Sequence, residues 1–164
     1  MRRVLVFVII GILAGAVSAR AEDRDLKFQG IGPRVGVSFS PDQFVFGGHL
    51  DFGDPFPHTN LLLPVVEIGV GDHQTVTSLG SDLLFRFRDR WGQWTPYVGG
   101  EVAIFIVTVD IPGGGNDTGS DLGLMGIFGV EKGIGADNRF GAELKFQIVD
   151  SPDLKLIAHW TFGH

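Results

Sequence analysis

The 164-residue sequence contains no cysteine, which excludes disulfides, cysteine-ligated zinc, iron–sulfur clusters and thiol catalysis. It also has no surplus of basic residues, since 13 Lys and Arg stand against 19 Asp and Glu and the net charge is −6. A nucleic-acid-binding protein needs a basic face to meet the phosphates. The sequence therefore predicts no nucleic-acid partner.

Charged residues and helix-type spacing of apolar residues are both scarce. Apolar residues make up 44% of the chain and charged residues 20%, which is too apolar a composition for a disordered chain. The length suits one compact domain. The 25 glycines and 8 prolines are more than a helical protein usually carries. These numbers favour a single β-rich domain.

Only the N-terminus carries a long hydrophobic run without charge. The run from Val4 to Val17 follows two arginines and ends in a small-x-small pattern at Ser18–Ala21, as in a secretory signal peptide. Its 14 residues are fewer than the roughly 20 that a membrane-spanning helix needs. We expect a signal peptide over residues 1–21, cleaved after Ala21, and a β-barrel domain over residues 22–164.

From Ile31 onward the apolar residues recur at every second position, which is the period of a β-strand. In the first strand, apolar side chains alternate with glycine, serine and one arginine, so that one face is entirely apolar. Turn signals separate the segments. The pattern predicts eight strands, at about residues 31–39, 44–52, 62–70, 78–87, 96–104, 121–131, 140–148 and 154–162.

The first hairpin suggests a register. If Phe39 pairs with Phe44 across a turn at Ser40–Gln43, the apolar faces of both strands coincide and Arg34 lies opposite His49. Proline removes a hydrogen-bond donor from the ladder. We therefore expect the three prolines within predicted strands to lie near strand ends or at bulges; these are Pro33, Pro64 and Pro96.

Eight antiparallel strands with one apolar face can close in two ways. A soluble calyx has the apolar face inside, and a membrane barrel has it outside. The apolar face here carries almost no charge, while the other face is mostly glycine and serine with one or two charges per strand, which suits a narrow lumen. The membrane barrel therefore predicts a paired network of lumen charges: Asp51, Glu67, Asp82, Glu101, Glu131 and Glu143 against Arg34, Arg86, Lys145 and Lys155, with His49 and His159 able to bridge.

Aromatic residues gather at one end of the predicted barrel. With both termini on the same side, eight of them come out near the end that holds the termini: Phe52, Phe56, Trp91, Trp94, Tyr97, Phe140, Trp160 and Phe162. Amphipathic rings gather in this way at the depth of lipid headgroups. The alternative interpretation is that Trp91 and Trp94 only cap the core beneath a turn. The collection as a whole favours the membrane barrel.

Three stretches carry a resemblance to a known family: Gly32–Gly36, Thr95–Gly100 and the closing Trp160-Thr161-Phe162. Over roughly residues 26 to 162 the chain resembles the small eight-stranded outer-membrane barrels of Gram-negative bacteria, of the outer-membrane protein A type. The resemblance implies that the barrel-assembly machinery recognises the terminal aromatic residues during insertion. This sequence departs from the pattern by ending on Gly163 and His164. No periplasmic peptidoglycan-binding domain is expected after the barrel.

Three sets of residues could carry chemistry. Glu143 and His159 face each other across the last predicted hairpin and could form a triad with a serine, as in outer-membrane lipid hydrolases. Both share the parity of the lumen, which favours a structural pair. The stretch Gly113–Asp121 resembles a calcium turn but lacks the regular ligand spacing, and the five histidines show no metal-binding spacing. We predict no catalytic, cofactor-binding or metal-binding residues.

The sequence thus predicts an all-β fold, a closed eight-stranded antiparallel up-and-down transmembrane β-barrel. The predicted function is that of a monomeric outer-membrane protein with a packed polar lumen and a structural or surface-interaction role. Its expected partners are outer-membrane lipids and the barrel-assembly machinery. Two alternatives remain, a lipocalin-like soluble binding barrel and an outer-membrane lipid-modifying enzyme. Val107–Ser120 is expected to be the long exposed loop.

Overall fold

The computed structural model describes residues 27–53, 60–87, 89–111 and 113–163. The predicted signal peptide over residues 1–21 and the ring of Phe56 lie outside them. The described residues form eight strands: β1 (Gly30–Phe39), β2 (Asp42–Asp51), β3 (Asn60–Gly71), β4 (Gln74–Arg86), β5 (Thr95–Asp110), β6 (Asn116–Ile134), β7 (Asn138–Val149) and β8 (Leu154–Gly163). The described segments contain no helix that is long and apolar enough to cross a membrane.

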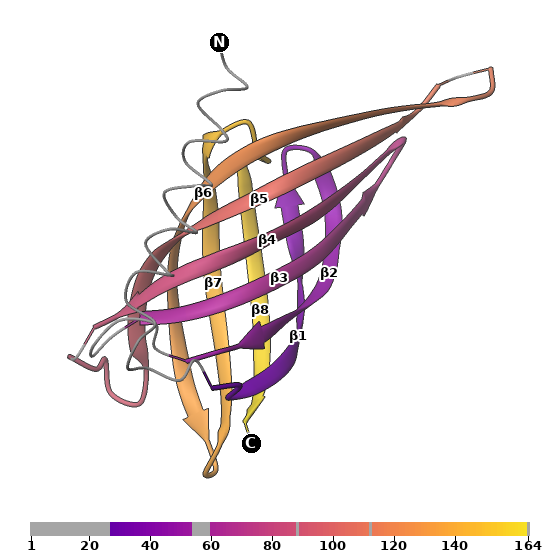
Figure 1. Ribbon diagram of the computed structural model, residues 1–164. Helices are drawn as coiled ribbons and strands as arrows, with labels where there is room; N and C mark the ends of the chain where they lie inside the picture. The colour runs from indigo at the N-terminus through magenta and orange to yellow at the C-terminus, as the bar shows by residue number, and fades with distance from the viewer. Residues whose placement is uncertain (1–26, 54–59, 88, 112, 164) are drawn as a thin grey trace, which may run out of the picture.

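Each strand pairs antiparallel with the next, and β8 pairs with β1, so that the sheet closes into a barrel in the order of the chain (Figure 1). The predicted eight-stranded up-and-down topology is confirmed. β1 begins and β8 ends at the same end of the barrel, which we call the terminal end. The turns after β1, β3, β5 and β7 lie at the opposite end, which we call the distal end. Closure leaves every strand with two neighbours over most of its length.

The first hairpin is tighter than the sequence suggested. Phe39 pairs with Asp42, and Val37 pairs with Phe44, so only Ser40 and Pro41 form the turn. The predicted pairing of Phe39 with Phe44 is therefore wrong. Arg34 lies opposite Gly47, not His49, whose partner is Gly32. The error is an even number of residues, so both apolar faces still coincide, as the side-chain alternation requires.

The three prolines lie where a ladder is interrupted on one side. Pro33 pairs with Gly48 of β2, but the β1–β8 ladder passes from Ile31 directly to Arg34. Pro64 lies just beyond the last β2–β3 pair, which is His49 with Val65. Pro96 lies beyond the last β4–β5 pair, at the start of β5. The expectation of strand ends or bulges is confirmed for Pro96, the second residue of β5. Pro33 and Pro64 lie within β1 and β3 instead, each where the ladder to one neighbouring strand is interrupted, so that the missing N–H is not needed on that side.

Val107–Ser120 is not a long loop. β5 and β6 continue in register through it, down to the pair Asp110 with Asn116, and only residues 111–115 form the turn. The Ile111 N–H donates to the Gly115 carbonyl at 3.0 Å, and three consecutive glycines at the tip have φ of 105–119°. The β-branched residues on both arms favour strand over loop. The hairpin projects beyond the distal rim (Figure 1).

The projecting arm of β6 has a free edge. Its residues Asn116–Gly123 pair with β5, whereas pairing with β7 begins only at Leu124, next to a β-bulge. Among the described strands, no other strand covers that edge. Residues Asn116 to Asp121 are polar or glycine and are exposed on both faces. The facing β5 side carries the exposed apolar residues Val109 and Ile111, and the two arms form a ribbon outside the barrel proper.

A substitution at Gly32 tests how closely β1 and β8 approach each other at the seam where the barrel closes. A Cβ atom at this position would overlap the backbone carbonyl of Trp160. We expect Gly32→Ala to lower the free energy of unfolding by about 1–3 kcal/mol, because overpacking must push two paired strands apart. The measurement is the urea midpoint of the detergent-folded barrel, followed by the gel shift of unboiled samples.

Gly100→Ala is the matched control, since a Cβ there would meet only the Met125 carbonyl oxygen at 3.5 Å. Its urea midpoint should stay close to that of the wild-type chain. Equal midpoints for the two variants would contradict the close approach at the seam.

Candidate functional site: the charged lumen and the apolar outer wall

The charged side chains of the strands point into the barrel and the large apolar ones point outward. Arg34, Glu101 and Lys145 are 2%, 1% and 0% exposed, whereas Val35 and Phe46, on the opposite face of the sheet, are 62% and 50% exposed. This is the arrangement of a membrane barrel and the reverse of a soluble calyx. A calyx would have to bury the face that is exposed here, so the geometry contradicts that alternative.

Arg34 of β1 lies at the centre of the lumen charges. Its Nε is 3.1 Å from Oε1 of Glu67, and its Nη1 donates to Oδ2 of Asp82 at 2.9 Å. Its Nη2 forms an ion pair with Oε1 of Glu143. The planar guanidinium can direct donors to several carboxylates at once. One arginine therefore ties β1 to β3, β4 and β7.

Lys145 of β7 contacts two of the same carboxylates, those of Glu67 and Asp82, and a third on Glu101. Its Nζ is 2.9 Å from Oε2 of Glu101, 3.2 Å from Oδ1 and Oδ2 of Asp82, and 3.4 Å from Oε1 of Glu67. Lys155 of β8 donates to Oε2 of Glu67 at 2.9 Å. The side chains of all of these residues are almost completely buried. Since buried ions are stable only when they are paired, each depends on the others.

A second ion-paired group lies nearer the terminal end. Arg139 pairs with Asp51, and Arg86 pairs with Glu131. The Nε of Arg139 is also 3.8 Å from Oε2 of Glu131. All the predicted lumen charges therefore contribute to ion pairs. Arg139 was missed because it stands at the start of its strand, yet it has the same parity as Glu143 and Lys145, so the alternation alone could have found it.

Tyr97 is a lumen residue, not part of the aromatic girdle. It is 1% exposed, and its hydroxyl donates to Oε2 of Glu143 at 3.1 Å and lies 3.0 Å from Nε2 of His159. The position of Tyr97 near a strand end suggested the girdle, but its parity matches that of Glu101 and turns the ring inward. The prediction for Tyr97 is wrong for this reason.

The candidate triad pair is brought together through that tyrosine. Glu143 and His159 both lie in the lumen, and the hydrogen-bond partner of His159 Nε2 is the Tyr97 hydroxyl, not a serine. His49 lies edge-on to His159, with ring centroids 5.5 Å apart, and its Nε2 is 2.8 Å from the Thr161 hydroxyl. A hydrolase needs a nucleophile in contact with its base. Here the hydroxyl of Tyr97, which bridges Glu143 and His159, occupies the position that a serine nucleophile would need.

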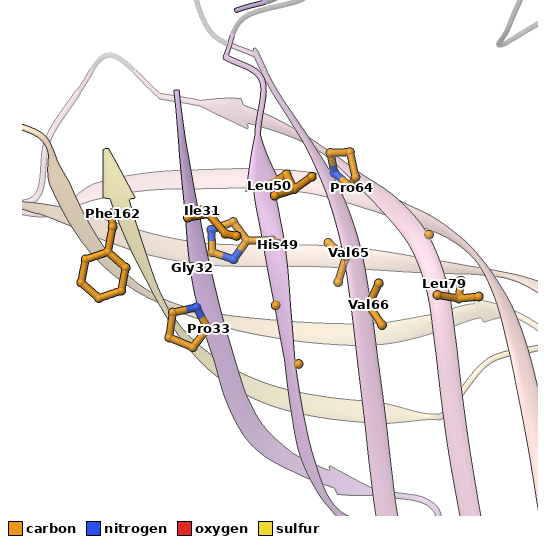
Figure 2. A pocket seen from close by; sticks show the side chains of 13 residues that line it. Ile31, Gly32, Pro33, His49, Leu50, Pro64, Val65, Val66, Leu79 and Phe162 are labelled. Atoms are coloured by element: carbon orange, nitrogen blue, oxygen red, sulfur yellow. The ribbon is translucent and has the colours of Figure 1, made fainter. Parts of the chain in front are cut away.

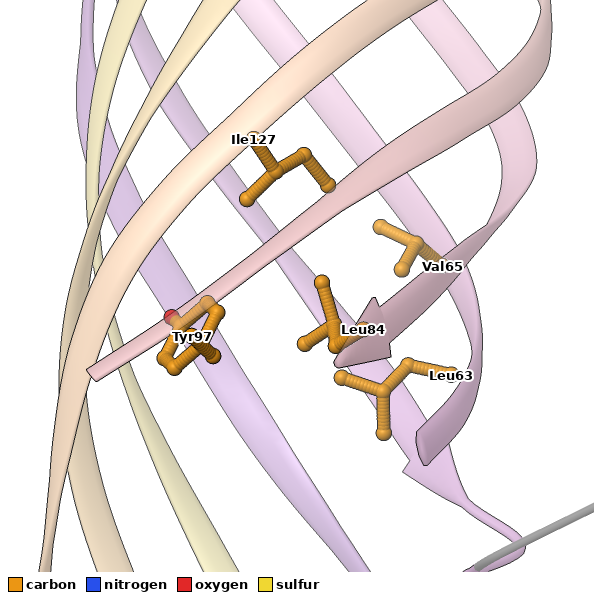
Figure 3. Packing of buried hydrophobic residues seen from close by; sticks show 5 residues of the cluster. All are labelled: Leu63, Val65, Leu84, Tyr97 and Ile127. Carbon is orange, nitrogen blue, oxygen red and sulfur yellow. The ribbon is translucent and has the colours of Figure 1, made fainter. Parts of the chain in front are cut away.

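The lumen is not uniformly polar. Leu63, Val65, Leu84, Tyr97 and Ile127 form one buried apolar cluster (Figure 3), and Val76, Ala103, Phe105 and Met125 form another. The packed lumen that the sequence predicts therefore holds apolar clusters beside its ion pairs. An eight-stranded barrel must fill its interior with side chains, and apolar groups can do this without needing further partners. The ring of Phe105 also lies 5.4 Å from the Nζ of Lys155, a cation–π contact.

The remaining aromatic residues of the predicted girdle contact one another at the terminal end. The rings of Trp94, Phe140, Trp160 and Phe162 form a continuous chain with centroid separations of 5.8–6.4 Å. Trp91 is exposed and contacts Phe128, while Phe52 contacts Phe28 edge-on. These contacts run along the outer wall rather than into the core, as the girdle prediction requires.

Metal-binding potential is limited in the part of the chain that the structure describes. No group of three or more His, Asp or Glu side chains is arranged there to hold a metal ion. Gly113–Asp121, which resembled a calcium turn in the sequence, is the tip and outer arm of the β5–β6 hairpin. Its two carboxylates, Asp117 and Asp121, lie on one face of an extended strand but four residues apart, which is about 13 Å, too far to share one ion.

Solved structures share this architecture. Neisserial surface protein A matches with a TM-score of 0.66 and 13% identity, covering 84% of this chain and 96% of its own. The N-terminal β-barrel domain of Pseudomonas aeruginosa OprF matches with a TM-score of 0.56 and 15% identity, covering 85% of this chain and 100% of its own. No protein-family model and no curated protein matches the sequence. The chain therefore has the fold of the small eight-stranded outer-membrane β-barrels.

Removal of Lys145 tests the lumen network. Lys145→Met would leave Glu67, Asp82 and Glu101 with too few cations, so we expect a loss of about 3–5 kcal/mol in the free energy of unfolding. Adding Glu101→Gln should recover part of the loss, because it removes the carboxylate at 2.9 Å from Lys145. Urea titration of the folded barrel in detergent measures both effects.

Lys132→Met is the control, since Lys132 shares the outward parity of Phe128 and Val130 on β6. It should change the midpoint little. A Lys145→Met barrel as stable as this control would show that the buried pairs do not hold the lumen together.

Proposed function

We propose that this protein is an outer-membrane β-barrel with a closed, side-chain-filled lumen and a structural or surface-interaction role. The observation that carries the proposal is the inverted distribution of side chains: ion pairs inside and exposed aliphatic and aromatic residues around the outside. Such an exterior is stable only against acyl chains. The fold shared with two outer-membrane barrels supports the same location.

The proposed partners are outer-membrane lipids and the barrel-assembly machinery. Phe162 is half exposed near the end of β8 and stacks with Trp160, with ring centroids 6.0 Å apart. This places alternate aromatic side chains on the outer wall of the last strand, where an assembly factor could contact them. We propose that the barrel acts as a monomer, inserted after export by the N-terminal signal peptide of residues 1–21.

We also propose that the barrel is not an enzyme. Glu143 and His159 lie inside the lumen, separated from the acyl chains by the barrel wall, and both are engaged with Tyr97. A lipid-modifying site would need its base and nucleophile on the surface that lipid can reach. The projecting β5–β6 hairpin is instead the part of the chain that is available for recognition at the distal end.

The location is tested by cell fractionation. The protein should sediment with outer membranes, need detergent for release, and migrate differently in gels when boiled and unboiled, because the closed barrel resists unfolding by detergent alone. Lipids extracted from cells with and without the protein should have the same composition. A detergent-independent periplasmic monomer would contradict the location, and a new lipid species would contradict the non-enzymatic role.

The closed lumen is tested by liposome swelling. Vesicles that contain the folded barrel should swell in isotonic sugar no faster than protein-free vesicles, because ion-paired and apolar side chains occupy the interior. A general porin reconstituted in parallel provides the positive control. Sugar-dependent swelling with this protein would show an open pore and would overturn the closed lumen without affecting the location.

A further inference from the structure

An apolar groove crosses the outer wall in the half of the barrel nearer the terminal end. It has a volume of about 680 Å³ and spans five neighbouring strands, from Phe162 on β8 across β1, β2 and β3 to Leu79 on β4 (Figure 2). The floor lies at Pro33 and Gly48, which are paired across β1 and β2, and at Pro64 on β3. The groove exists because these positions carry a flat ring or no side chain between taller neighbours.

Gly48 interrupts an otherwise bulky row. The other outward positions of β2 are Phe44, Phe46 and Leu50. A Cβ atom at Gly48 would have a single neighbour within 4 Å, the Gly32 carbonyl oxygen at 3.3 Å, a tight contact that a shift of a few tenths of an ångström would relieve. By contrast, a Cβ atom at Gly47 would overlap the backbone of β3. The missing side chain at Gly48 thus opens space on the outer wall, and the strands approach each other less closely there than at Gly47.

The barrel fills a comparable gap elsewhere with its own side chain. Gly126 on β6 also points outward, and the ring of Phe146 from β7 occupies the space where its side chain would lie. Among the described residues that line the groove, none covers Gly48 in this way. An uncovered apolar hollow of this size in a membrane-facing wall must take up another apolar group.

We propose that this groove binds one acyl chain of a membrane lipid and holds it more tightly than the surrounding lipid shell. The proposal rests on the proposed function, since it needs the outer wall to face acyl chains. Five strands at a spacing of about 4.8 Å make the groove about 19 Å long. Because the groove runs perpendicular to strands that tilt by about 35–45° from the barrel axis, it rises about 11–13 Å along the membrane normal. One leaflet of a hydrocarbon core of about 30 Å is about 15 Å deep, so a single chain can lie along the groove.

The shape of the groove favours an acyl chain over another protein. A second barrel presents a convex wall, which cannot fill a narrow hollow on an already convex surface. The side chains that point outward around the groove, such as Ile31, Val66 and Leu79, carry no hydrogen-bonding group that a polar partner could use. A flexible hydrocarbon chain can follow the floor across the strands and contact the flat faces of Pro33 and Pro64.

The test uses the full-length mature barrel in phosphatidylethanolamine–phosphatidylglycerol vesicles that contain a phospholipid with a nitroxide on its acyl chain. Electron paramagnetic resonance counts the motionally restricted lipids per barrel. Gly48→Leu places a side chain on the groove floor, and we expect it to lower the count by about one, as displacement of a single chain from an apolar site requires. Gly100→Leu, at an open outward glycine on β5 outside the groove, should keep the wild-type count.

A second measurement needs no substitution. A phospholipid with a photoreactive diazirine in its acyl chain should label the groove-lining segments of β1 to β4 more strongly than equally exposed segments of β5 to β7. Uniform labelling, or equal restricted-lipid counts in all three proteins, would overturn the groove proposal. A chemical cross-link between copies that Gly48→Leu abolishes would also overturn it, by making a second barrel the occupant.

The outcomes separate this proposal from the proposed function. A boiled-versus-unboiled gel shift and recovery with the vesicles show that each variant has folded and inserted. If the wild-type barrel inserts and the counts are equal, the groove proposal alone fails. If the wild-type barrel does not associate with vesicles at all, the outer-membrane function fails with it.

Discussion

The closed, narrow lumen forces its buried charges to pair, and the rest of the structure depends on this constraint. Backbone ladders connect only consecutive strands and the closing β8–β1 pair. The contacts of Arg34 and Lys145 instead connect β1 and β7 to carboxylates on β3, β4 and β5. Because an unpaired ion in this interior would be strongly destabilising, the network permits only an arrangement of strands in which these side chains meet.

The same constraint explains which features the sequence could reveal. Alternation with a period of two assigns each residue to one face, and closure of the sheet makes these faces inside and outside everywhere. Strand number and topology followed from the alternation and the turn signals. The lumen position of charges such as Arg34 and Glu143 followed from their parity together with the scarcity of charge on the apolar face. Tyr97 and Arg139 obeyed the same rule, and only their positions near strand ends led to a wrong or missing assignment.

Registers and strand lengths were less accessible, because they depend on turns and on partners distant in sequence. Moving the first turn from Ser40–Gln43 to Ser40–Pro41 shifts the pairing without changing any face, so the hydrophobic pattern could not detect it. The length of the β5–β6 hairpin was also hidden, since its β6 arm, Asn116–Asp121, is polar and carries no apolar alternation that would mark a strand. The groove at Gly48 could not be predicted either, because it requires knowledge of the residues beside it on β1 and β3.

The two ends of the barrel differ in their residues. The terminal end carries the tryptophans and their ring contacts on the outer wall, whereas the distal end has short turns and one projecting ribbon. The free edge of that ribbon carries Asp117 and Asp121. Charged side chains on an open edge oppose pairing with a second, identical edge. The ribbon can therefore extend beyond the bilayer without joining barrels to one another, which agrees with the monomer that we propose.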